Sequence, residues 1–159
     1  MRTTLTLLLG TALLLGCSAE PSTPAAGNPA PSANQQETTA RIGGTTVRAT
    51  VLQTALLGEL VADKYGIARA HNQVMLLVGL RQGESSEETS VPARITATAT
   101  DLRGQRHVIE LRELHSGDLL DYLGTVQVSL PDTLRFELDI TLENGAHSTM
   151  RFNREFLPL

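Results

Sequence analysis

The chain has 159 residues, and its 13 lysines and arginines against 17 aspartates and glutamates give a formal net charge of −4. Because there is no basic excess to neutralise phosphates, this composition argues against nucleic acid as a partner. Cys17 is the only cysteine, so a disulfide within the chain is excluded.

Residues 1–16 have the layout of a secretory signal peptide. Arg2 is the only charged residue before the apolar stretch of residues 5–15, as in the positive and hydrophobic regions of such signals. About 11 apolar residues rise roughly 16 Å as a helix, which is about half the thickness of a hydrocarbon core. We therefore expect this segment to direct export rather than to span a membrane.

The signal ends in Leu14-Leu15-Gly16-Cys17, which resembles the lipobox of bacterial lipoproteins. The resemblance implies cleavage before Cys17 and acylation of its thiol with chains such as palmitate, which together form a membrane anchor. The alternative is a free thiol in a discarded peptide. Ser18 stands where an aspartate tends to retain such proteins in the inner membrane. The resemblance therefore implies the inner leaflet of the outer membrane, facing the periplasm.

Residues 18–40 are rich in proline, alanine and small polar residues and contain no aromatic residue, leucine, isoleucine or valine. Such a segment cannot bury enough apolar surface to offset the entropy of ordering. We therefore expect residues 17–40 to form a lipidated cysteine with a disordered tether. Residues 41–159, about 120 in number, are then long enough for one domain.

Strands and one helix are predicted along this domain in chain order. Residues 45–54 form the first candidate strand, and residues 59–66 favour a short helix that Gly66 ends in the left-handed conformation. Residues 72–81 form the next candidate strand. In residues 91–100, small and branched apolar side chains alternate with polar ones, which predicts a strand with one buried side.

Four more strands are predicted at residues 106–114, 120–130, 134–142 and 147–156. The alternation is strictest in residues 134–142, where the even positions are leucine, phenylalanine and isoleucine. Asn144-Gly145 suits a two-residue type I′ turn before the last strand. Seven strands at this spacing are typical of an all-β fold, an immunoglobulin-like antiparallel β-sandwich. We expect the five strands from Val91 onward to follow one another as a meander.

Three blocks of this domain, residues 60–73, 99–118 and 134–156, are similar to the exported bacterial proteins of the DUF 4426 family. The resemblance covers nearly the whole domain and implies a small β-sandwich, while the family has no established catalytic residues or function. Two departures stand out. His115-Ser116 occupies a position where a charged pair is commoner, and the lipobox with its tether replaces a plain signal.

The four histidines are candidates for metal binding or acid-base chemistry: His71, His107, His115 and His147. No two have the spacing of a known metal motif, so we interpret them as solvated surface residues and predict no metal site and no cofactor. Exported copper carriers resemble a β-sandwich with methionine and histidine at one end, and His71 with Met75 and His147 with Met150 offer such a cluster. The methionines are more simply core residues.

No G-x-S-x-G elbow surrounds Ser116, so a serine hydrolase lacks its usual signature. Four acids could supply a catalytic pair but are more typical of a solvated strand face: Glu110, Glu113, Asp118 and Asp121. Five arginines lie on or beside predicted solvent-facing sides: Arg94, Arg112, Arg135, Arg151 and Arg154. We interpret them as cross-strand ion-pair partners in preference to an anion or peptide site.

The sequence thus predicts a lipoprotein anchored through Cys17 that acts as a non-catalytic binding or envelope-accessory module. We predict no catalytic residue, and the ligand-binding residues are left open. The membrane is the expected partner through the lipid, and an envelope protein is a further candidate. The alternative is a copper carrier or hydrolase that uses His71 or His115.

Overall fold

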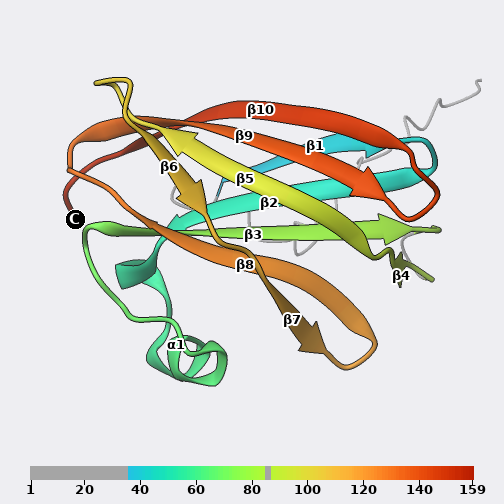
Figure 1. Cartoon of the computed structure of the whole chain (residues 1–159). Helices are drawn as coiled ribbons and strands as arrows, with labels where there is room; N and C mark the ends of the chain where they lie inside the picture. Colours follow the sequence, from blue (N-terminus) through green and yellow to red (C-terminus); the bar gives the residue numbers. More distant parts are fainter. Residues whose placement is uncertain (1–35, 85–86) are drawn as a thin grey trace, which may run out of the picture. The chain divides into compact units, whose positions relative to one another are not determined.

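The computed structural model describes residues 36–84 and 87–159. The predicted signal peptide, Cys17 and residues 18–35 of the tether lie outside the described residues. Within them, two antiparallel β-sheets and one short α-helix account for the regular structure (Figure 1). No helix of the described part is long and apolar enough to cross a membrane.

Sheet A has the order β1-β2-β3-β8-β7, and a short strand β4 also pairs with β3. Its strands are β1 (Gln36–Ile42), β2 (Thr45–Gln53), β3 (Gln73–Gln82), β4 (Thr89–Ser90), β7 (Arg112–Ser116) and β8 (Leu119–Gln127). Sheet B has the order β10-β9-β5-β6. Its strands are β5 (Ala93–Thr100), β6 (Arg106–Ile109), β9 (Asp132–Leu142) and β10 (His147–Phe156).

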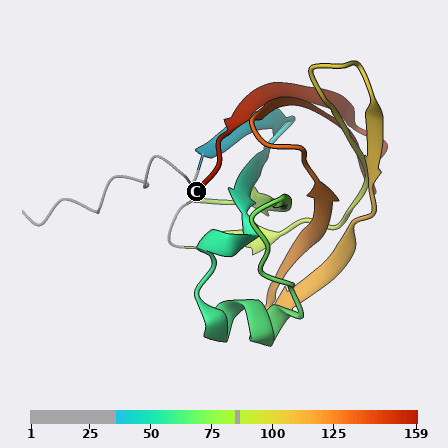
Figure 2. The ribbon, with the colours of Figure 1, turned by 90° about the vertical axis from the view of Figure 1, so that its left-hand side faces the viewer.

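The two sheets pack face to face, as the view along the strands shows (Figure 2). Alternation of side chains along each strand puts one apolar set between the sheets. From sheet B this set includes Phe136, Leu138 and Ile140, and from sheet A it includes Leu76 and Leu80, all with no exposed surface. Full burial of a side chain of this size stabilises the fold by about 1.5–3 kcal/mol.

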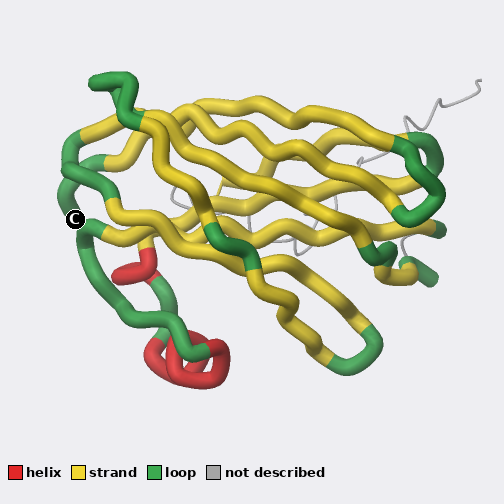
Figure 3. Tube along the Cα trace, viewed as in Figure 1, coloured by secondary structure: helices red, strands yellow, loops and turns green. Residues whose placement is uncertain are grey.

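The helix α1 (Glu59–Tyr65) follows the 3₁₀ turn η1 (Thr54–Leu56) and lies against the outer side of sheet A (Figure 3). A second apolar cluster joins them: Leu52, Leu57, Ala62, Ile67, Met75 and Leu123. Gly66 ends the helix at φ 62°, and its N–H donates to the carbonyl oxygens of Ala62 and Asp63. The predicted helix and its glycine cap are therefore confirmed.

The all-β sandwich is also confirmed, and each of the seven predicted strands has a counterpart. The even residues from Leu134 to Leu142 are buried, as their alternation predicts. Five details of the prediction are wrong. The tether was expected to extend to residue 40, but β1 begins at Gln36 and pairs with β2. The short strand β4 was also missed.

The predicted strand at residues 106–114 is two strands that belong to different sheets. β6 pairs with β5 in sheet B, whereas β7 pairs with β8 in sheet A, so the chain crosses between the sheets at Glu110 and Leu111. The predicted meander is wrong for the same reason, because β9 pairs with β5 and β10 rather than with β8. Strand order follows from the packing of the two sheets, and chain order does not determine it.

The turn at Asn144-Gly145 lies where predicted, but its loop has three residues. Leu142 N–H donates to Ala146 O at 2.8 Å, and Gly145 N–H donates to Leu142 O at 2.9 Å. Gly145 has φ 83°, which is the arrangement of a turn followed by a left-handed glycine bulge. The predicted two-residue type I′ turn is therefore wrong.

Candidate functional site

A cleft of about 660 Å³ lies beside β8. Three segments and Gln73 form its walls. Residues 66–68 lie just after α1, and residues 123–125 belong to β8. Residue 108 and residues 110–112 belong to the segment that runs from β6 through the crossing to the start of β7. We call it the β8 cleft. Its volume lies within the range of about 300–1,000 Å³ that is typical of ligand sites.

Gly124 allows the crossing segment to pass close to β8. A Cβ atom at this position would lie 2.6 Å from Ile109 Cγ2 and 2.7 Å from the carbonyl oxygen of Glu110. Real Cβ atoms do not approach other atoms so closely, so any side chain would push the crossing backbone away. Glycine is therefore required because of this contact, which brings one wall of the cleft against β8.

The walls of the β8 cleft combine apolar and polar groups. Ile67 and Leu123 are buried, whereas Val108 is 74% exposed. The guanidinium of Arg112 donates to the carbonyl oxygen of Tyr65, which connects the end of α1 to the start of β7. Glu110 and Ala68 are exposed at the cleft. A hydrogen bond thus connects two walls of the cleft, and the side chains of Glu110, Ala68 and Val108 are accessible to a ligand.

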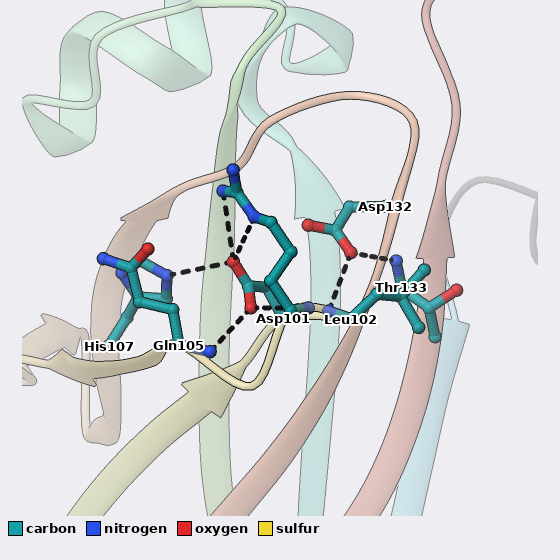
Figure 4. Close-up of polar contacts among 7 residues, drawn as sticks. Asp101, Leu102, Gln105, His107, Asp132 and Thr133 are labelled. Carbon is teal, nitrogen blue, oxygen red and sulfur yellow. Dashed lines mark hydrogen bonds and ion pairs between the residues drawn. The ribbon is translucent and has the colours of Figure 1, made fainter.

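A second, smaller cavity of about 270 Å³ contains a polar cluster around Asp101, at the loop between β5 and β6 (Figure 4). Asp101 Oδ1 accepts hydrogen bonds from the backbone N–H groups of Arg103 at 3.0 Å and Gln105 at 2.7 Å. Its Oδ2 lies 3.3 Å from Arg103 Nη2 and 4.0 Å from His107 Nε2. The carboxylate is therefore surrounded by donors.

Burial acts to raise the pKa of Asp101, but the hydrogen bonds from Gln105 and Arg103 outweigh it and hold the pKa below its ordinary value. Asp132 is also buried, and its Oδ1 accepts from Leu102 N–H at 3.1 Å and Thr133 N–H at 2.7 Å. It thereby fastens the β5–β6 loop to the start of β9 (Figure 4). We interpret both carboxylates as groups that fix these loops.

The four histidines do not gather at one place in the described structure. His71 precedes β3 and His147 begins β10, and these two strand starts lie at opposite ends of the sandwich (Figure 1). His107 is half-buried beside Asp101. His115 is exposed on β7, where its Nε2 lies 3.4 Å from Glu113 Oε2.

The methionines that the copper hypothesis paired with histidine also lie apart. Met150 is buried between the two sheets, and Met75 is buried in the cluster beneath α1. Across residues 36–84 and 87–159, no three side chains of histidine, cysteine, aspartate or glutamate converge in a way that would hold a metal ion. The structure thus does not assemble the cluster that His71 with Met75 and His147 with Met150 were considered to form.

The four candidate acids occupy different surroundings. Asp121 pairs with Arg81 at 2.5 Å, Glu113 lies beside His115, and Glu110 lines the β8 cleft. Asp118 is exposed in the β7–β8 turn. Ser116 is likewise exposed, as the last residue of β7. This distribution offers no paired carboxylates of the kind that glycoside hydrolysis requires.

Of the five arginines, Arg151 fits the ion-pair interpretation, because its Nε lies 2.6 Å from Glu137 Oε2 on the neighbouring strand. Arg154 differs from the expectation. It lies opposite the buried Leu134, so it points toward the inner side of sheet B, where it covers the Phe152 ring and donates to Thr38 of β1. Its Nε has no partner among the described residues, and burial lowers its pKa.

Neither the β8 cleft nor the Asp101 cluster was predicted from the sequence. An aspartate three residues before a glycine is a usable signal for such a loop, because the carboxylate can accept backbone N–H groups further along the turn. The cleft has no comparable signal. Its walls come from segments that are distant in sequence, and only the fold brings them together.

Comparison with known proteins agrees with the fold. A family model for a domain of unknown function, DUF4426, matches residues 39–158. The crystal structure of a DUF4426 family protein from Pseudomonas aeruginosa PAO1 is similar, with a TM-score of 0.65 and 25% sequence identity over 77% of this chain and 96% of that chain. No curated protein matches this sequence.

FetP from uropathogenic Escherichia coli strain F11 shares the fold at lower identity. The protein as isolated has a TM-score of 0.56 and 12% identity, over 79% of this chain and 97% of that chain. A copper-bound variant of FetP has a TM-score of 0.54 and 11% identity over the same shares. At such identity the likeness concerns the fold alone. The family match spans most of the chain, and we conclude that this protein belongs to the DUF4426 family.

Proposed function

We propose that the protein is a lipid-anchored, periplasm-facing module that binds its ligand in the β8 cleft without catalysing a reaction. The observation that carries this proposal is the cleft itself, a cavity of about 660 Å³ with walls from three segments. The lipobox-like sequence ending at Cys17 and the following Ser18 support the anchor and the location.

The surroundings of the ionisable groups support a binding role. The carboxylate of Asp101 already accepts hydrogen bonds from its own loop, and Asp121 is paired with Arg81. General acid-base catalysis needs a titratable group that can reach a reacting atom. In the β8 cleft the titratable side chains are Glu110 and Arg112, and Arg112 is engaged with Tyr65. This set favours recognition over chemistry.

A photo-crosslinking amino acid in the full-length protein tests the cleft. Ala68 is exposed and lines the cleft, so a crosslinker there should capture whatever occupies it in intact cells. Glu143 is exposed in the β9–β10 loop and serves as the matched control. We expect a discrete adduct from position 68, identified by mass spectrometry, and none from position 143. Equal adducts at both positions, or none at either, would refute binding at the cleft.

A further inference from the structure

The strand β8 extends beyond its neighbour β7. β7 pairs with β8 from Ser116 opposite Leu119 to Arg112 opposite Leu123, and there the ladder stops. The chain before Arg112 has crossed from sheet B, where β6 pairs with β5. Residues 124–127 of β8 therefore have β3 on one side and no paired strand on the other, within the described residues.

The ladder pattern identifies which backbone groups face this open side. Val128 N–H donates to Asn72 O at 2.9 Å, next to the pair formed by Gln73 and Gln127. In an antiparallel ladder, hydrogen-bonded and non-hydrogen-bonded pairs alternate. Gly124 and Val126 therefore bond to β3, while Thr125 and Gln127 direct their N–H and C=O groups away from it.

The β7–β8 hairpin leads to the same assignment independently. Its two-residue loop makes Ser116 and Leu119 a hydrogen-bonded pair, so Leu123 also directs its backbone groups toward β7. Thr125 and Gln127 continue this series two and four residues further along β8. Their backbone groups face the positions that the next residues of β7 would occupy, had the chain not crossed to sheet B.

We infer that the β8 cleft binds an extended polypeptide segment as an added strand on β8, in line with β7. This inference rests on the proposed function and names the class of ligand. Thr125 and Gln127 each direct one N–H donor and one C=O acceptor toward the open side of β8. This spacing on alternate residues of one strand matches the backbone of an extended peptide. A neighbouring strand lies about 4.8 Å away and directs successive side chains to opposite faces.

The walls of the cleft suit those side chains. One set would contact Ile67 and Ala68 after α1, and the other would contact Val108 of β6 and Leu111 of the crossing segment. Residues 18–35 of the chain itself are poor candidates for this strand, because they contain four prolines. Proline lacks the N–H that pairing requires. The occupant is therefore a segment of another protein, with apolar side chains at alternate positions.

Display of random twelve-residue peptides, selected on the full-length lipidated protein in lipid nanodiscs, tests the inference. We expect enriched peptides with little proline whose binding is lost in Ala68→Trp, which fills the cleft, and kept in Glu143→Trp. Single N-methylation along one enriched peptide should weaken binding at least about tenfold at alternate residues and by less than about threefold between them. Failure to enrich any peptide overturns the inference.

The methylation pattern separates this inference from the proposed function. Loss of binding in Ala68→Trp without any alternation would overturn the added strand and leave the cleft as a site. Binding that Ala68→Trp does not change would place the peptides elsewhere and overturn the inference as well. In the protein itself, the Thr125→Pro variant should fold but should no longer bind the peptides, because it lacks the N–H of residue 125 that faces the cleft. Val126→Pro should unfold, because that N–H pairs with β3.

Discussion

Phe136 of β9 stacks on Phe152 of β10 between the two sheets, with ring centroids 5.1 Å apart and 17° between the ring planes. The two residues are direct partners in the β9–β10 register. Phe156 contacts Phe136 edge to face, at 6.5 Å between centroids. Three rings from one hairpin thus occupy the same part of the core, and Phe136 at the centre has no exposed surface.

Replacement of Phe136 by alanine should therefore destabilise the domain strongly. Loss of the buried ring and the cavity it leaves should cost about 3–5 kcal/mol. The control is Arg135→Ala, which removes an exposed side chain from the neighbouring residue of the same strand and should change the free energy of unfolding by about 0.5 kcal/mol or less. Urea unfolding measures both. Equal small losses would contradict the register of β9.

Asp101→Asn should make the stability of the domain less dependent on acid pH. The pKa of Asp101 is below its ordinary value in the folded state, so its charged form contributes stability above the ordinary carboxyl pKa of about 3.9. This contribution is lost as pH falls through the lower, folded-state value. At pH 7 the variant should melt at a lower temperature than the original protein.

Melting temperatures between pH 7 and pH 2 measure this difference. The gap between the two proteins should narrow below about pH 4, because the carboxylate takes up a proton there in the unfolded original protein and only at lower pH in the folded one. The ionisable groups that face Asp101 are Arg103 and His107, and both are unchanged in the variant. A gap that stays constant down to pH 2 would show that the charge of Asp101 does not contribute.

Gly124→Ala should destabilise the domain, because its new Cβ would lie 2.6–2.7 Å from Ile109 and from the backbone of Glu110. A shift of the crossing backbone of this kind typically costs about 1–3 kcal/mol. Gly44→Ala is the matched control, since its Cβ would meet only the end of the Gln82 side chain at 3.8 Å. Thermal unfolding of both variants measures the contrast, and similar melting temperatures would rule out the close approach at β8.

Cys17→Ser should abolish lipidation, because the chain has no other thiol to accept a lipid. Metabolic labelling with radioactive palmitate, followed by gel electrophoresis of the full-length protein, measures this directly. The original protein should carry the label, and the variant should accumulate as an unprocessed, unlabelled precursor. Label that persists on the variant would end the lipoprotein interpretation.

The strongest sequence signals predicted the structure where local pattern and burial agree. Leu138 and Ile140 stand at alternate positions of one strand with a solvated opposite face, so their period of two was sufficient. The helix before Gly66 was predictable because its composition and its terminal glycine both indicate the same element. In these segments, neighbours in sequence determine the structure.

Elements that depend on distant partners escaped prediction. β1 has the sequence QETTARI, with few apolar residues, and it joins sheet A through its ladder with β2. No local residue marks the crossing at Glu110, because the two halves of the predicted strand differ only in which sheet they join. The β8 cleft exists because of that crossing, so it was beyond sequence reasoning too.

Sheet A also connects β1 to β8 through an unbroken series of hydrogen-bonded strands. A pull on the backbone at Gln36 reaches Thr125 through three ladders, from β1 to β2, from β2 to β3 and from β3 to β8. Sheet B is not on this route. If the chain before Gln36 is fixed to a membrane, tension from a strand held at β8 passes across the hydrogen bonds of one sheet. The strength of those ladders then limits the load that the anchored protein can bear.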